Sequence, residues 1–246
     1  MATTIAISGK GGSGKTTIAA MIIRILSQAS KKSILGVDAD PNACLGFTLG
    51  TEVTGDIAEL REKVRTKEQI SEGTDRVRAF EYGLQQIIME DKGFDLLTMG
   101  RPEGPDCYCA ANNLLRKFMD KLSTQYSFVV MDNEAGMEHI SRRTTNHVDL
   151  LCIVAEPSPI GEVTVQRICD LASKLPIDVK QMGVIWNKTD NIKNLDSIES
   201  LGFIPYDKDI FDISMEGKNI FDVETNSPAF SAVQKMLANK LNLNIT

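Results

Sequence analysis

The chain has 246 residues, of which 42% are hydrophobic and 24% charged, a composition that suits a globular protein with a sizeable core. Its formal net charge of -6 argues against broad binding to nucleic acid or to anionic membranes. We find no secretory signal and no apolar run of the ~18–20 residues that a membrane span needs, so we expect a cytoplasmic protein.

Apolar runs typical of buried parallel strands alternate with helical segments along the chain. We predict strands at residues 3–8, 33–38, 95–99, 127–132, 150–156, 181–187 and 202–206. We predict helices at residues 15–29, 41–49, 80–91, 112–123, 138–147, 160–175 and 228–242. This alternation predicts one α/β domain over residues 1–246, with a mostly parallel sheet flanked by helices on both faces. We interpret the most polar stretch, residues 51–79, as a peripheral insertion.

The stretch GKGGSGKTT follows the first predicted strand and opens the first predicted helix. It matches the P-loop pattern G-x-x-x-x-G-K-[ST], in which backbone N–H groups and the helix N-terminus hold phosphates. Lys15 would reach the β and γ phosphates, and the Thr16 hydroxyl would bind Mg²⁺. The predicted nucleotide-binding residues of this loop are Gly9, Gly11, Gly12, Ser13, Gly14, Lys15, Thr16 and Thr17.

Two aspartates end the second predicted strand in the stretch VDADPN. Asp38 and Asp40 project to the same side if the backbone stays extended. One carboxylate would bind Mg²⁺ through water and the other would orient the attacking water. Asp40 followed by Pro41 is also typical of a helix N-cap with proline at the first helical position. Both roles are compatible.

A further acidic residue, Asp132, ends the strand in FVVMDNEAGMEH. A carboxylate at this position is the usual Mg²⁺ partner of a P-loop. Gly136 would place its N–H near the γ phosphate, and the segment that follows would then sense whether that phosphate is present.

The five cysteines fall into two groups. Cys44, Cys152 and Cys169 have apolar neighbours, so we predict small core residues. Cys107 and Cys109 form the stretch DCYC before a predicted helix, and their soft thiolates suit Ni²⁺, Zn²⁺, Cu⁺ or an iron–sulfur cluster. One Cys-x-Cys pair makes an incomplete site, and two chains across a two-fold axis would supply four sulfurs. Four thiolates in one plane suit Ni²⁺, whereas four thiolates in a tetrahedral arrangement suit Zn²⁺.

Together these segments resemble the dimeric ATPases typified by the septum-positioning protein MinD, the ParA proteins and the nitrogenase iron protein. DCYC and DNEAGMEH are most similar to the CooC-type ATPases, which mature nickel carbon monoxide dehydrogenase and the related acetyl-CoA synthase. The resemblance implies a homodimer in which Lys10 reaches the partner's nucleotide. It also implies that Asp40 orients the attacking water and that the client is one of those nickel enzymes.

The resemblance places the nucleotide base near the stretch WNKTD, where Asn187 would contact adenine and Lys188 would lie beside it. We predict that Pro205, Tyr206 and Asp207 form a second wall of the base pocket. Asn-Lys-x-Asp is also the guanine-reading pattern of GTPases. We favour ATP, because the P-loop and both switch segments resemble those of ATPases, and GTP remains the alternative.

Three functions compete at this point. The first is an ATP-driven dimer that inserts nickel through Cys107 and Cys109. The second is a positioning ATPase that acts on a membrane or on DNA. That function needs a basic face or tail, whereas Val233, Met236, Leu237 and Leu241 near the C-terminus have the helical spacing of a core-facing stripe. The third is an iron–sulfur reductase resembling the nitrogenase iron protein.

Overall fold

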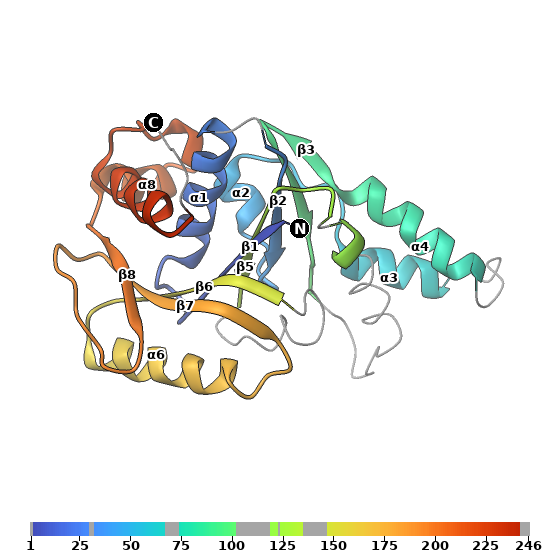
Figure 1. Cartoon of the computed structure of the whole chain (residues 1–246). Helices are drawn as coiled ribbons and strands as arrows, with labels where there is room; N and C mark the ends of the chain where they lie inside the picture. The colour runs from blue at the N-terminus through green and yellow to red at the C-terminus, as the bar shows by residue number, and fades with distance from the viewer. Residues whose placement is uncertain are drawn as a thin grey trace.

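The computed structural model describes residues 2–29, 32–66, 74–101, 119–122, 124–134 and 147–241. One twisted sheet runs through the molecule, with helices on both of its faces (Figure 1). The strands are β1 (Thr3–Gly9), β2 (Ile34–Ala39), β3 (Met89–Asp91), β4 (Phe94–Thr98), β5 (Phe128–Asn133), β6 (His147–Ala155), β7 (Asp178–Asn187) and β8 (Glu199–Ile204). Their order across the sheet is β3-β4-β2-β5-β1-β6-β7-β8.

The helices of the described residues are α1 (Lys15–Ala29), α2 (Leu45–Leu49), α3 (Ile57–Thr66), α4 (Thr74–Ile87), α6 (Pro159–Ala172), α7 (Lys208–Met215), the 3-10 helix η2 (Ile220–Asp222) and α8 (Pro228–Leu241). None of them is both long and apolar enough to cross a membrane. Every strand pair is parallel except β3 with β4, which is an antiparallel hairpin at one edge. The carboxyl ends of β1, β2, β5, β6 and β7 therefore meet at one edge of the sheet.

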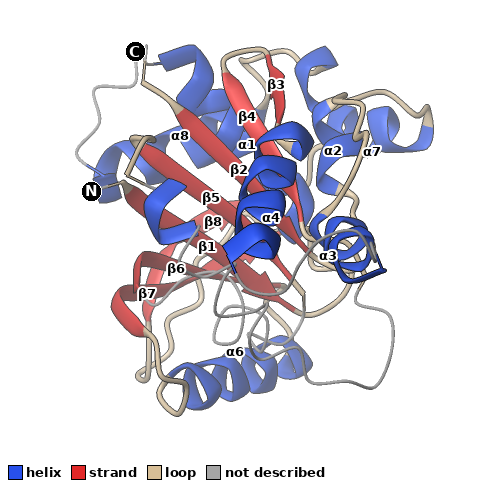
Figure 2. Ribbon diagram, turned by 90° about the vertical axis from the view of Figure 1, so that its right-hand side faces the viewer, coloured by secondary structure: helices blue, strands red, loops and turns tan. Residues whose placement is uncertain are grey.

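Alternate side chains of each strand enter different hydrophobic clusters. On one face, Ile5 and Ile7 of β1 pack against α1, α2 and α8. The opposite face carries two clusters: Val37 of β2 packs with α3 and α4, whereas Trp186 of β7 packs with α6. Figure 2 shows α6 set apart from the α3–α4 pair. The predicted core-facing stripe near the C-terminus is confirmed, because Val233, Met236 and Leu237 of α8 are buried and Leu241 packs against the same cluster.

A buried arginine ties α1 to the C-terminal part of the chain. Arg24 is 4% exposed, and its guanidinium donates to the carbonyls of Ile220 and Val223 while lying over the rings of Phe221 and Phe230. Burial lowers its pKa from the usual value, although the charge of Asp222 opposes the shift. The P-loop helix is thus held to the segment that precedes α8.

The structure corrects several predicted elements. Residues 51–79 contribute two helices, α3 and the start of α4, and Ile57 and Leu60 of α3 are buried against the sheet. The predicted helix at 80–91 ends at Ile87, because Met89–Asp91 form β3 and turn at Lys92 and Gly93 into β4. The predicted helix at 41–49 is confined to α2, since Asp40 and Asn42 form a turn instead. His147, predicted as the end of a helix, is the first residue of β6.

Candidate nucleotide and metal-ion site

The P-loop begins where β1 ends. Gly9 closes β1 with φ +152°, and a Cβ there would lie 2.3 Å from the carbonyl oxygen of Val154 on β6. Only glycine can therefore carry the chain out of the sheet at this position. The loop then folds on itself through Ser13 N–H donating to Lys10 O at 3.1 Å, and α1 starts at Lys15. Sequence and structure agree that the loop lies between a buried strand and a helix N-terminus.

The residues of the P-loop differ in exposure. Lys10, Gly11 and Gly12 are exposed at the tip, whereas Ser13 and Lys15 are 6% exposed. Thr16 and Thr17, in the first turn of α1, are half-buried. A cavity of about 240 Å³ opens beside the tip, between the P-loop and the start of α6. The exposed Lys10 lines this cavity, on the opposite side of the loop from β5.

Thr16 and Asp132 lie together at the carboxyl ends of β1 and β5. The Thr16 hydroxyl donates to Asp132 Oδ2 at 2.6 Å. Asp132 is fully buried, and its second oxygen, Oδ1, has no hydrogen-bond partner in the described part of the chain. Desolvation raises the pKa of Asp132 to about 6, while the Thr16 hydrogen bond and the charge of Lys15 pull it down. An orphaned carboxylate oxygen beside a hydroxyl is open to a cation.

Asp38 lies beside Asp132 on the neighbouring strand, since the two residues are register partners. Asp38 is fully buried and accepts from the backbone N–H groups of Leu45 at 2.8 Å and Asp40 at 3.3 Å. Burial, helped by the charge of Asp132, raises the pKa of Asp38 to about 7. Asp40 is half-buried, and its Oδ1 accepts from both the backbone and the side-chain nitrogen of Asn42 at 2.9 Å. The segment from Asp38 to Asn42 is therefore a turn that leads into α2.

The predicted Mg²⁺ residues fit such an ion. Carboxylate and hydroxyl oxygens are the ligands it prefers, and its charge would offset the mutual repulsion of Asp38 and Asp132. Among the described residues no group of three or more His, Cys, Asp or Glu side chains is placed to hold a metal ion. That is compatible with Mg²⁺ at a P-loop, because this ion uses few protein ligands together with water and phosphate oxygens.

Asn187 ends β7, two strands from β1, yet its side chain contacts the P-loop. It is 8% exposed, and its Nδ2 donates to the carbonyl oxygen of Ser13 at 2.7 Å. The next residue, Lys188, approaches both the Gly12 carbonyl at 3.4 Å and Glu156 Oε1 at 2.8 Å. The structure thus brings two residues predicted for the base pocket onto the loop predicted for the phosphates.

The second predicted wall of the base pocket lies after β8. Tyr206 is 58% exposed and stacks at an angle on Phe211, with ring centroids 6.4 Å apart. Asp207 is 9% exposed, and its carboxylate accepts from the backbone N–H groups of Asp209 at 3.0 Å and Ala229 at 3.2 Å. Asp207 therefore caps α7 and bonds to the first turn of α8, whereas Pro205 is half-buried and Tyr206 is exposed.

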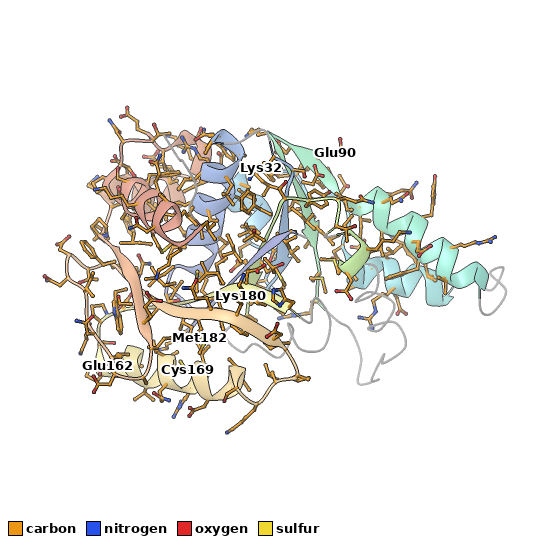
Figure 3. The ribbon with its side chains drawn as sticks, viewed as in Figure 1. Lys32, Glu90, Glu162, Cys169, Lys180 and Met182 are labelled. Atoms are coloured by element: carbon orange, nitrogen blue, oxygen red, sulfur yellow. The ribbon has the colours of Figure 1, made fainter. Side chains whose placement is uncertain are left out.

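Several predicted residues lie outside the described residues: Gly136 and the pair Cys107 and Cys109. Of the other cysteines, Cys152 is buried as predicted, and Cys169 is half-buried on α6, facing Met182 of β7 (Figure 3). The prediction was wrong for Cys44, which is exposed, because α2 begins only after it. Partial desolvation and the nearby charge of Asp38 nevertheless raise the pKa of the Cys44 thiol.

One residue of the site escaped the sequence analysis. Glu156 directly follows β6, and its partner is Lys188. The signal available in the sequence was a charged residue directly after a buried strand. Because β6 lies beside β1, the carboxyl end of β6 lies close to the P-loop.

Comparisons with known proteins agree with this architecture. Residues 4–220 match the family model described as the CobQ/CobB/MinD/ParA nucleotide binding domain. An uncharacterized ATP-binding protein of Methanocaldococcus jannaschii is 38% identical, with 97% of this chain and 98% of that protein covered. The carbon monoxide dehydrogenase accessory protein CooC of Rhodospirillum rubrum is 31% identical, with 92% and 90% covered. A solved ParA family ATPase from Chlorobium tepidum superposes with a TM-score of 0.72 at 20% identity, covering 98% of this chain and 99% of that one, which confirms the predicted fold.

Proposed function

The chain belongs to the CobQ/CobB/MinD/ParA family of nucleotide-binding domains, and from this premise we propose that it is an ATP-driven factor that delivers nickel to an enzyme. It is an ATP-binding P-loop protein of the MinD/ParA type. The observation that carries the nickel proposal is the Cys107–Cys109 pair in a chain that is 31% identical to a carbon monoxide dehydrogenase accessory protein. Its client would be carbon monoxide dehydrogenase or acetyl-CoA synthase.

Phosphoryl transfer needs positioning and positive charge more than covalent chemistry. Lys15, at the start of α1, would hold the β and γ phosphates, and backbone N–H groups of residues 11–16 would surround them. Mg²⁺, held by Thr16 and Asp132 and through water by Asp38, would neutralise charge on the phosphates. Asp40, half-buried in the turn after β2, would orient the attacking water.

A second copy of the chain would complete the site. Lys10 is exposed at the tip of the P-loop and lines a cavity on its outer side, so its ammonium is available to a partner's nucleotide. The same closure would bring two Cys-x-Cys pairs together around one nickel ion, the cargo. Hydrolysis would remove the γ-phosphate contacts, open the dimer and release the ion to the client. ATP would be preferred to GTP.

The proposal is tested by nickel titration with and without ATP, followed by size-exclusion chromatography and metal analysis. We expect one Ni²⁺ per two wild-type chains and loss of that ion in the double variant Cys107→Ser/Cys109→Ser. Cys169→Ser, which removes a half-buried thiol on α6, is the matched control and should bind nickel normally. Undiminished nickel uptake by the double variant would remove the delivery function and leave the ATPase. A preference for Zn²⁺ in the same titration would change the cargo.

The fold shared with a ParA family ATPase favours a second candidate, a positioning ATPase that binds DNA or a membrane. The apolar positions of α8 argue against a membrane anchor in that helix, because they pack against α1 and β8. Sedimentation with DNA or with anionic vesicles, with and without ATP, separates the two functions. ATP-dependent sedimentation would favour the second.

A further inference from the structure

The contact of Asn187 with the P-loop has consequences for the direction of the loop's peptide groups. In a trans peptide, the carbonyl of one residue and the N–H of the next point in opposite directions. Asn187 holds the Ser13 carbonyl on the β7 side at 2.7 Å, so the Gly14 N–H points away from β7. Several N–H groups turned to one side are what makes a backbone loop bind an anion. The Asn187 amide therefore helps to set the phosphate-binding face of the loop.

Asn187 lies so close to the loop that there is no room for a side chain at Gly14. A Cβ on Gly14 would lie 2.4 Å from Asn187 Nδ2, and Gly14 has φ +96°. The other end of the amide is also engaged, since Asn187 Oδ1 accepts from the Lys188 N–H at 3.0 Å. With 8% exposure and both ends of its amide bonded to protein, the Asn187 side chain is directed at the loop.

Lys188 adds a second attachment one residue earlier in the loop. It has φ +57°, and Ala43 is the other non-glycine residue with positive φ in the described part of the chain. A lysine in this conformation is strained, and such backbone strain persists only where surrounding contacts require it. The turn sends the Lys188 ammonium back to the Gly12 carbonyl at 3.4 Å and to Glu156 at 2.8 Å.

Glu156 is itself fixed by backbone contacts. Its carbonyl oxygen accepts from the Ser158 N–H at 2.7 Å, and Gly161 of α6 packs so closely that a Cβ there would lie 2.0 Å from the same oxygen. Three adjacent parallel strands, β1, β6 and β7, therefore supply the P-loop, Glu156 and the Asn187–Lys188 turn. These residues form one connected brace on the outer side of the loop.

We propose that Asn187 and Lys188 are positioning residues that hold the P-loop in its phosphate-binding shape, with Glu156 as the anchor of Lys188. The proposal rests on the P-loop being the ATP site and is independent of nickel. It differs from a base-reading role for Asn187 in one measurable way. A residue that shapes the loop affects every ligand with a polyphosphate, whereas a residue that reads the base affects only ligands that carry one.

The test compares ATP with inorganic tripolyphosphate, both with Mg²⁺, by titration calorimetry on the wild type and on Asn187→Ala. Loss of one buried hydrogen bond to the loop is expected to weaken both ligands by the same factor, roughly tenfold. A loss confined to ATP would overturn the proposal and assign Asn187 to the base. Unchanged binding of both ligands would overturn it as well. If the wild type itself binds neither ligand, the proposed ATP site fails, which is a different result from any change in the variant.

Two further variants protect the test against simple misfolding. Glu156→Gln keeps the shape of the side chain and removes its charge, so both ligands should weaken by about two- to threefold, and less at high salt, because the pair is half-exposed. Glu162→Gln is the matched control. It breaks the ion pair between Glu162, labelled on α6 in Figure 3, and Lys193, a pair for which the described part of the chain shows no hydrogen bond or ion pair to the P-loop. Equal effects of Glu156→Gln and Glu162→Gln would overturn the role of Glu156.

Discussion

On the side of the P-loop that faces β7, the carbonyls of Gly12 and Ser13 are held by Lys188 and Asn187. On the side that faces β5, Asp132 has a buried oxygen with no partner in the described residues, and Asp38 lies buried beside it. The carbonyls on the first side already have protein partners, whereas the second side buries two carboxylates whose pKa values are raised. The braced side of the loop that we propose to bind phosphate thus adjoins two buried carboxylates that a bound cation would neutralise.

This contrast is sharpened most strongly by removing the charge of Asp132. Asp132→Asn should lower kcat for ATP hydrolysis on the order of 10²-fold, because the ion that neutralises the phosphates loses its buried carboxylate. Phosphate release at increasing Mg²⁺ concentration measures the effect. Asp178→Asn, a change to an exposed carboxylate at the opposite end of the strands, is the control and should retain activity. Full activity of Asp132→Asn would show that the β5 side does not need its charge.

A smaller effect is expected on the stability of the metal-free protein. Folding raises the pKa of Asp38 from 3.8 to about 7 and that of Asp132 to about 6, so both favour the protonated form. Their contribution to stability is fully present below about pH 4 and is lost as the pH rises through about 6–7. Asp38→Asn should therefore stabilise the protein at pH 8 on the order of 2 kcal/mol and flatten the pH dependence.

Urea unfolding in the presence of EDTA, at pH 5.5 and pH 8, measures this effect. In a parallel series without EDTA, added Mg²⁺ should stabilise the wild type at pH 8 and have less effect on Asp38→Asn. If the stability of the wild type does not fall from pH 5.5 to pH 8, ionisation of Asp38 and Asp132 does not destabilise the folded protein.

The smallest effect is expected at Lys188, on the side of the loop that faces β7. Two variants separate the strain of its left-handed backbone from the contacts of its ammonium group. Lys188→Gly relieves the left-handed backbone but loses the ammonium, whereas Lys188→Met loses the ammonium alone. The glycine variant should be more stable than the methionine variant by about 1 kcal/mol, measured by thermal unfolding. Both should bind ATP about threefold more weakly than the wild type. A methionine variant as stable as the glycine variant would show that the turn carries no strain.

The sequence predicted the seven longer strands and the bounds of α1, because apolar runs and the P-loop are strong local signals. It did not predict α7, a short helix of eight residues in which Ile210 and Ile213 have helical spacing but are only partly buried against the core. It read α3 as polar insertion, although Ile57, Leu60 and Val64 have helical spacing on one face.

Within the site, sequence motifs located the P-loop and the aspartates but not the contacts between segments. Asn187 and Ser13 are 174 positions apart, and only the order of β1, β6 and β7 across the sheet brings them together. The raised pKa values of Asp38 and Asp132 depend first on burial, which follows from the central place of β2 and β5 in the sheet, and periodicity alone does not give that place.

Trp186, the sole tryptophan of the chain, directly precedes Asn187, is fully buried, and donates its indole N–H to the Lys193 carbonyl. Its emission is thus a built-in, label-free optical gauge of strain in the turn that follows it. A stopped-flow trace recorded with pyrophosphate in place of a nucleotide would then time the arrival of an anion at the loop.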